Sequence, residues 1–277
     1  MATPEEKLAA LHQMATVPEY ATIVPLFAAI FDYVRNNGQT GIGVDTAPDR
    51  GARTAAGFPL LLPADIRVDR EVLTRFLLGL VAVLREHGNA GDDALARCAQ
   101  KLSSGAFDPG PLIPALLERR RAPLDEAATG LAMPPPLLEY LMEIPLKTAL
   151  EQYSAEIPPE GFPEWQESLC PVCGSPPGMA ELAAEEGRRL LSCSTCFFKW
   201  PFKRLKCPFC GCEDTEKLSY FTVDDGPTRV DSCGACSRYL KTRDSRRGNA
   251  AVPLEVEDLL TIHLDLMAAR EGLERGR

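Results

Sequence analysis

Eight of the ten cysteines in this 277-residue chain form four Cys-x-x-Cys pairs, and these are the residues best suited to do chemistry. The pairs are Cys170/Cys173, Cys193/Cys196, Cys207/Cys210 and Cys233/Cys236. Two intervening residues let a tight turn point both sulfurs at one ion. Two such turns complete the tetrahedron of a closed zinc or rubredoxin-like iron site. Four pairs within residues 170–236 therefore predict two mononuclear metal sites, each with four thiolate ligands.

The residues inside two of the pairs suit such turns. Cys170 and Cys207 each begin the pattern Cys-Pro-x-Cys-Gly. Proline fixes one backbone angle of the turn, and glycine tolerates a positive φ just after the second ligand. Backbone amides in the turn can donate hydrogen bonds to the sulfurs and spread their charge. Sequential pairing along the chain is the simplest arrangement, but an interleaved cross-brace is also compatible with the spacing. The spacing does not separate iron from zinc.

The remaining thiols and the histidines offer no further site. Thioredoxin-like redox chemistry is disfavoured, because one reactive pair suffices for it and no βαβ pattern surrounds these pairs. Cys98 sits in a helical pattern, which predicts a small buried side chain. Cys212 directly follows the third pair and could lie near the second metal. His12, His87 and His263 are scattered and are expected to be ordinary surface or boundary residues.

The charge balance and hydropathy exclude several classes of protein. The formal net charge is -9 and the pI is about 5.0, which argues against a dedicated nucleic-acid-binding protein. No stretch approaches 18 consecutive apolar residues, so no membrane span is expected. The start, MATPEEK, is acidic and lacks the apolar core of a secretory signal, so we expect a cytoplasmic protein. In that reducing compartment, a disulfide framework is not expected.

A basic, aromatic bridge lies between the second and third pairs, within CSTCFFKWPFKRLKCPFC (residues 193–210). Between residues 197 and 247, eleven Lys and Arg stand against seven Asp and Glu. These cations could compensate the anionic metal–thiolate centres, or their face could dock a partner. A nucleic-acid-binding role is the third alternative. The residues predicted to bind a partner are Lys199, Trp200, Lys203 and Arg204.

The first half of the chain is expected to be helical. Thr3 and Glu6 have the form of a capping box, Asp69 can cap a long helix that Gly88 ends, and Pro145 should kink or shorten the last helix. A Gly-, Pro- and Thr-rich loop is expected over residues 38–63. The other predicted helices cover residues 18–37, 70–87, 92–103, 111–120 and 136–153.

The second half is predicted to form short strands around the cysteine pairs, followed by a helix. Residues 154–169 carry three prolines and predict a linker or a docking strap. Two small ribbons of this kind have little core, so bound metal should supply much of their folding energy. The strands are expected near residues 188–192, 217–223, 229–231 and 239–241, and an amphipathic helix over 253–270.

These elements together predict an α+β fold. It consists of an N-terminal α-helical domain, two tandem rubredoxin-like or zinc-ribbon four-cysteine modules, and a closing C-terminal helix. The composition shifts place the α-helical domain at residues 1–160, the first module at 161–205, and the second module with the C-terminal helix at 206–277.

Three segments resemble the formate dehydrogenase accessory protein family, FdhE. They are LSCSTCFFKWPFKRLKCPFCG, RVDSCGACSRYLKT and EVEDLLTIHLDLMAAREGLERG. The resemblance is most specific from Leu169 to Gly276, and all eight paired cysteines match the ligand positions of the family. It implies a helical domain followed by two rubredoxin-like modules, with iron favoured and zinc possible.

The resemblance also implies a function. It suggests a cytoplasmic maturation factor that is needed for an active respiratory formate dehydrogenase and that binds the catalytic subunit before export. We expect a chaperone-like protein and not an enzyme, since eight ligands fill two tetrahedra and leave no open coordination position. The alternatives are a redox-active iron protein acting in cofactor maturation and a nucleic-acid-binding zinc-ribbon protein.

Overall fold

The computed structural model describes residues 2–45, 50–88, 90–158, 161–162, 165–223, 226–247 and 252–276. The chain divides into two compact units. The helical unit comprises Thr3–Pro48 and Leu61–Tyr153, and the sheet unit comprises Asp49–Leu60 and Ser154–Arg277 together with the first two residues. Among the described residues, no helix has the length and apolar character that crossing a membrane requires.

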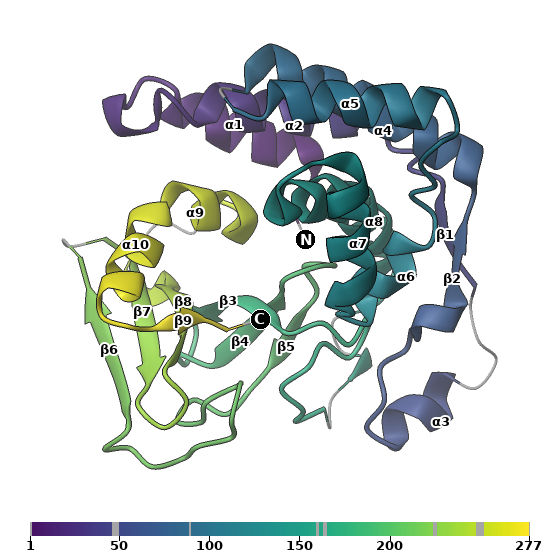
Figure 1. Cartoon of the computed structure of the whole chain (residues 1–277). Helices are drawn as coiled ribbons and strands as arrows, with labels where there is room; N and C mark the ends of the chain where they lie inside the picture. The colour runs from purple at the N-terminus through teal and green to yellow at the C-terminus, as the bar shows by residue number, and fades with distance from the viewer. Residues whose placement is uncertain are drawn as a thin grey trace. The chain divides into compact units, whose positions relative to one another are not determined.

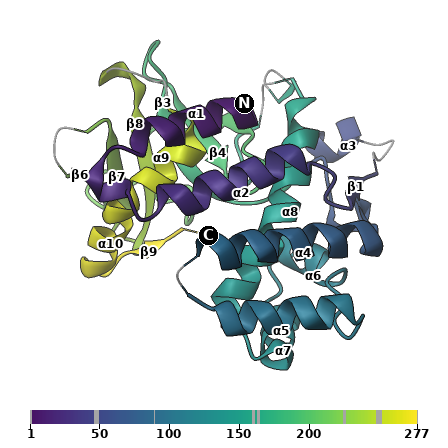
Figure 2. The same cartoon turned by 90° about the horizontal axis from the view of Figure 1, so that it is seen from above.

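The helical unit is a bundle in which α1 packs on α2, α2 on α4, and α4 on α5. Both views show α4 and α5 running side by side (Figures 1 and 2). Leucines and a phenylalanine recur every three or four residues of α4 and are buried, which is the expected core-facing stripe. The helices are α1 (Pro4–Met14), α2 (Val24–Asn36), α4 (Arg70–His87), α5 (Asp92–Ser103), α6 (Leu112–Leu117), α7 (Arg121–Leu131) and most of α8 (Pro135–Ala155).

Two predicted helix starts are confirmed in atomic detail. The hydroxyl of Thr3 accepts a hydrogen bond from the Glu6 amide, while the Glu6 carboxylate accepts one from the Thr3 amide. Asp69 accepts hydrogen bonds from two amides in the first turn of α4, and the helix ends at His87, directly before Gly88. These side chains satisfy amides that have no partner within the helix.

Two predictions for residues 18–63 hold only in part, and residues 46–49 of the expected loop lie outside the described residues. The expected helix over residues 18–37 is a 3-10 turn, Pro18–Tyr20, followed by α2 from Val24. Pro25 explains the late start, because proline fits only the first turn of a helix. The expected loop contains β1 (Ile42–Val44), which pairs with β2 (Ile66–Val68), and the short helix α3 (Arg50–Ala55).

The last three helices of the helical unit also differ from expectation. The predicted helix over 111–120 is shortened to α6, and α7 was not foreseen. Pro145 does not shorten α8, which continues through it for ten more residues. Apolar residues on both sides of the proline, including Leu141 and Leu146, are buried, and their packing offsets the lost backbone hydrogen bond.

The sheet unit is built on one seven-stranded sheet with the order β5-β4-β3-β8-β7-β6, while β9 pairs with β8. The four strands expected from the sequence are confirmed as β4, β6, β7 and β8; β3, β5 and β9 were not foreseen. The bounds are β3 (Pro177–Leu182), β4 (Arg189–Cys193), β5 (Lys199–Pro201), β6 (Leu218–Thr222), β7 (Thr228–Cys233), β8 (Arg238–Asp244) and β9 (Glu274–Arg275).

The two cysteine modules share this sheet. β3 and β4 belong to the first module and β7 and β8 to the second, each as an antiparallel pair. β3 then pairs in parallel with β8, with Met179 opposite Lys241 and Leu182 opposite Asp244. The modules are tandem in sequence, but backbone hydrogen bonds join them in space, so neither depends on its own small core alone.

The closing helix expected over residues 253–270 is present as two helices, α9 (Leu254–Leu260) and α10 (Ile262–Arg270). The break lies at Thr261, whose hydroxyl donates a 2.7 Å hydrogen bond to the Glu257 carbonyl. Such back-bonding bends helices. The carbonyls of Asp258 and Thr261 accept hydrogen bonds from the fully buried Lys241 on β8. α10 packs on β7 (Figure 1).

The predicted strap at residues 154–169 contributes to the core of the sheet unit. Phe162 packs edge-on against Trp165 and Phe198, with ring centroids 6.3 and 5.4 Å away. The Trp165 indole donates a 2.9 Å hydrogen bond to the carbonyl of Leu169, the residue before the first cysteine pair. The described part of this segment therefore docks beside the first module.

Candidate metal centres

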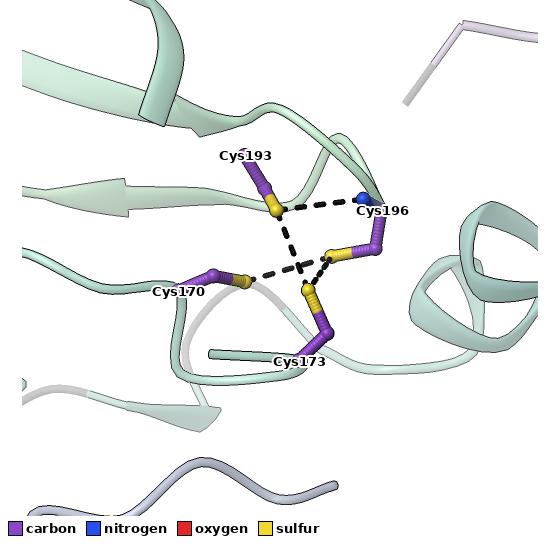
Figure 3. Close-up of side chains that lie close together, drawn as sticks. All are labelled: Cys170, Cys173, Cys193 and Cys196. Carbon is purple, nitrogen blue, oxygen red and sulfur yellow. Dashed lines mark hydrogen bonds between the residues drawn. The ribbon is translucent and has the colours of Figure 1, made fainter. Parts of the chain in front are cut away.

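The first four-cysteine group consists of Cys170, Cys173, Cys193 and Cys196. The turn before β3 supplies the first two, and the hairpin between β4 and β5 supplies the others. Figure 3 shows all four sulfurs converging on one point. The Sγ–Sγ distances are 3.5 Å for each of three pairs: Cys170 to Cys196, Cys173 to Cys193, and Cys173 to Cys196.

Backbone amides of the turns support these sulfurs. The Val172 amide donates to Cys170 Sγ at 3.4 Å, and the Thr195 and Cys196 amides donate to Cys193 Sγ at 3.3 and 3.4 Å. Such hydrogen bonds favour the thiolate form and hold the sulfurs in place. The expected amide support is thus present in the first group.

The second group consists of Cys207, Cys210, Cys233 and Cys236. Cys207 and Cys210 follow the bridge, and Cys233 and Cys236 lie at the turn between β7 and β8. Sγ–Sγ distances are 3.8 Å for Cys207 to Cys236 and 3.7 Å for Cys210 to Cys233. The cysteines therefore group sequentially along the chain, as in the simpler of the two predicted pairings.

All four turns share a left-handed residue immediately after their second cysteine. The expected glycines fill this position in two turns, with φ of 72° at Gly174 and 74° at Gly211. Phe197 and Ser237 occupy it in the other two, with φ of 58° and 55°. A residue with a Cβ adopts this conformation at a cost of roughly 1 kcal/mol, so the geometry of the turn outweighs local preference.

The sulfur spacing fits a tetrahedral metal. A Zn–S bond of about 2.3 Å in a regular tetrahedron places sulfurs about 3.8 Å apart. In both groups all four sulfurs lie within 4.8 Å of one another. Burial raises the pKa of the Cys170 and Cys196 thiols, which disfavours clustered thiolates unless a cation neutralises them. A bound metal would supply that charge and crosslink the two turns.

The two groups differ in exposure. All four cysteines of the first group are buried. In the second group Cys207 and Cys233 are buried, Cys236 is half-buried and Cys210 is exposed. Both groups are positioned to bind one metal ion each, but solvent and chelators reach the second more readily.

The bridge residues are placed differently from one another. Lys199 pairs with Glu181 at 2.7 Å, Lys203 pairs with Glu213, and Arg204 is exposed and forms no ion pair within the described residues. Trp200 is fully buried, and its indole donates to the carbonyl of Glu167 at 3.2 Å. Trp200 is thus part of the core of the sheet unit.

Glu181 is the residue near the bridge that sequence reasoning missed. It lies on β3 and accepts hydrogen bonds from Lys199, Arg243 and Ser245 at 2.7, 2.8 and 2.5 Å. No local pattern marks it, because its partners come from β5 and from the region of β8. The sequence feature that could have revealed Glu181 is its position as an acidic residue within the otherwise apolar segment PGMAEL, which indicates a buried carboxylate with partners.

The two unpaired cysteines take no part in either group. Cys98 is fully buried in α5, as predicted, and burial raises the pKa of its thiol to about 11. Cys212 is half-buried, and its carbonyl accepts a 2.8 Å hydrogen bond from the Cys207 amide. Cys212 therefore supports the turn through its backbone.

Comparison with known proteins identifies both cysteine modules. Residues 169–204 match the family model described as FdhE, central domain, and residues 205–277 match FdhE, C-terminal domain. The boundary between the two matches falls inside the bridge.

Curated relatives agree over the same part of the chain. A protein named Protein FdhE homolog from Aquifex aeolicus is 36% identical over 112 residues, which are 39% of each chain. A protein of the same name from Proteus mirabilis is 35% identical over 130 residues, which are 45% of this chain and 42% of the relative. The chain thus spans about two fifths of the length of the curated relatives that it matches.

A solved structure extends the likeness in fold to nearly the whole chain. The crystal structure of the FdhE protein from Pseudomonas aeruginosa matches with a TM-score of 0.71 at 21% sequence identity. The match covers 99% of this chain and 94% of that one. The predicted fold class is confirmed, and the predicted resemblance to FdhE is confirmed over residues 169–277, which match the central and C-terminal domain models of that family.

Proposed function

We propose that this protein is a cytoplasmic, chaperone-like maturation factor for a respiratory formate dehydrogenase. It binds the catalytic subunit before export and is not itself a catalyst. The observation that carries the proposal is the match to both FdhE domains, with all eight paired cysteines brought into two groups. Four thiolates complete a tetrahedron, so each group, once metal-bound, would lack the open position that a catalytic metal uses.

The eight cysteines are proposed as ligands of two iron ions, one in each group. Sulfur-only tetrahedra suit both iron and zinc, and the rubredoxin-like character of the family favours iron. The visible absorption of the purified protein tests this identity. Ferric thiolate sites are coloured, whereas a colourless protein with two zinc ions per chain would contradict the assignment to iron.

The surface proposed to meet the catalytic subunit is the exposed part of the bridge. Arg204 and Lys203 lie on this surface, and Lys199 is half-buried beside Glu181. Trp200 is left out of the proposed contact because its side chain is fully buried. Its role in the proposal is to hold β5 and the bridge in place.

A genetic complementation experiment tests the function. Cells that lack the protein should synthesise the catalytic subunit but show little formate dehydrogenase activity, and the wild-type gene should restore it. The Cys207→Ser/Cys210→Ser variant should fail to restore activity, whereas a Cys98→Ala variant, whose thiol lies outside both groups, should succeed. Normal activity in the absence of the protein would contradict the proposal.

A further inference from the structure

A basic pocket lies beside the second four-cysteine group, within the sheet unit. Its walls come from the start of β4, from residues 204–209 of the bridge and its following turn, and from the β6–β7 hairpin. Its volume of about 90 Å³ has room for several water molecules or for one small charged group. The charged side chains that line it are Arg189, Arg204, Lys206, Arg229, Arg238 and Asp231.

The charges of this pocket do not balance. Among the described lining residues, Asp231 is the one carboxylate beside five cations, and its two oxygens already accept hydrogen bonds from Arg229 and Thr242 at 2.7 and 2.8 Å. A divalent metal with four thiolates in the adjacent group would add about two negative charges. Lys206 also pairs with Glu213, just outside the pocket, at 3.9 Å. The pocket would still be positive by about one charge, so compensation of the metal centre does not account for all of its cations.

Arg189 is a buried cation of the pocket wall, and its guanidinium lies 3.7 Å from Asp231 Oδ2. Its side chain is 5% exposed, and one terminal nitrogen donates to the Lys206 carbonyl at 2.9 Å. Its Nε has no hydrogen-bond partner within the described residues. Burial lowers the pKa of this guanidinium, which nevertheless stays charged at neutral pH. Asp231 is shared between this guanidinium and that of Arg229, so one carboxylate faces two cations and the pocket wall keeps an excess of positive charge.

The rim of the pocket is apolar as well as basic. Leu205 and Tyr220 both line it, and they are 55% and 61% exposed. Arg204 and Arg238 are exposed beside them, and neither forms an ion pair within the described part of the chain. Tyr220 lies on β6, which is an edge strand of the sheet and thus a place where an extended segment can add.

We propose that this pocket binds one carboxylate side chain of an acidic, partly apolar peptide segment. The carboxylate accepts hydrogen bonds from the exposed rim guanidiniums of Arg204 and Arg238 and is also attracted by the charge of the buried Arg189. Neighbouring apolar side chains of the segment contact Leu205 and Tyr220. Guanidiniums bind phosphate as well as carboxylate, and the choice of a peptide carboxylate rests on the exposed apolar side chains of Leu205 and Tyr220, which inorganic phosphate would leave uncovered. The source of the segment rests on the proposed function, because the catalytic subunit would carry it. The pocket itself is argued from its lining residues alone.

A peptide-binding experiment on the metal-loaded full-length protein tests the pocket. The probe is a fluorescein-labelled peptide of alternating glutamate and leucine, followed by anisotropy at low and physiological salt. The test variant is Arg204→Glu/Arg238→Glu, which changes exposed rim residues only. The matched control is Arg188→Glu/Arg270→Glu, which changes the net charge equally at exposed positions outside the pocket.

We expect the rim variant to bind the peptide at least about tenfold more weakly and the control to change less than about twofold. If both variants bound the peptide equally weakly, general charge attraction would explain the binding, and the proposal would be overturned. Tighter binding of inorganic phosphate than of the peptide would overturn the choice of a carboxylate. Rim-dependent peptide binding without capture of the catalytic subunit would leave the pocket standing and the proposed function refuted.

Discussion

The ammonium group of Lys241 lies 2.7 Å from Asp265 Oδ2, and the lysine side chain is fully buried. A carboxylate oxygen of Asp258 lies at the same distance from it, and Arg275 pairs with both carboxylates from β9. This cluster connects the middle of the sheet to α9, α10 and β9. The sequence predicted one continuous closing helix, but the structure has a break at Thr261. Lys241 donates hydrogen bonds to the carbonyls of Asp258 and Thr261 at this break.

Replacement of Lys241 by methionine should therefore destabilise the protein. The change leaves two half-buried carboxylates with one arginine between them, and removal of the fully buried partner from such a cluster costs about 3 kcal/mol. Chemical denaturation of the metal-loaded protein measures this change in the free energy of unfolding. Lys217→Met, at an exposed position, is the control and should change it by less than about 0.5 kcal/mol. Equal losses in the two variants would show that the cluster is not a source of stability.

The two metal centres should differ in how fast they lose metal. Cys210 is exposed in the second group, whereas all four cysteines of the first group are buried, so a chelator should remove the second metal about tenfold faster or more. Timed chelation with metal analysis measures both phases. The Cys170→Ser/Cys173→Ser variant should retain only the fast phase, and Cys207→Ser/Cys210→Ser only the slow one. A single rate for both metals, or the opposite assignment, would contradict this exposure argument.

The free energy of unfolding should decrease in acid because of Glu181. Burial by itself would raise the pKa of its carboxyl, but hydrogen bonds from Lys199, Ser245 and Arg243 outweigh burial and lower the pKa to about 2. The unfolded carboxyl titrates near its ordinary pKa of about 4.3. Its contribution, about 3 kcal/mol, is therefore complete above pH 5 and disappears as the pH falls toward 2.

A Glu181→Gln variant isolates this contribution. The difference between its unfolding free energy and that of the wild type should be largest near pH 6 and shrink between pH 5 and 2. Metal loss in acid affects both proteins and cancels in the difference. A difference that stays constant over this range would mean that the carboxylate charge contributes nothing.

Ser237→Gly should stabilise the second module. Ser237 is exposed and holds φ of 55°, a conformation that glycine adopts without strain, so we expect a gain of roughly 0.5–1 kcal/mol. Thermal unfolding provides the measurement. Ser104→Gly is the control, because Ser104 is exposed with an ordinary φ of -83° and should gain nothing. A lower unfolding temperature for Ser237→Gly would show that contacts of the serine side chain contribute more stability than relief of the backbone strain.

The sequence predicts best what depends on short-range chemistry. The capping box at Thr3, the cap at Asp69 and the glycines after Cys173 and Cys210 follow from residue types a few positions apart. That the two cysteines of each Cys-x-x-Cys turn share a site follows from their spacing for the same reason, although this spacing left sequential and interleaved grouping of the turns both open. Each of these features is decided by local backbone geometry.

Features that depend on distant partners escape such reasoning. The parallel pairing of β3 with β8 joins residues some sixty positions apart, and no local pattern announces it. The burial of Trp200 is decided by β4 and by the strap at Glu167, so an aromatic residue among lysines looked like part of a surface. α8 runs through Pro145 because buried neighbours on both sides outweigh local preference.

The proposed engagement of the catalytic subunit of a formate dehydrogenase depends on the half of the chain that holds both four-cysteine groups. Capture of the tagged protein from its native cells, with quantitative mass spectrometry, tests it most directly. We expect strong enrichment of the catalytic subunit with the wild type and with Cys98→Ala, and its loss with Cys207→Ser/Cys210→Ser. Absence of the subunit from the wild-type capture, while another enzyme or nucleic acid is retained, would contradict the proposed function.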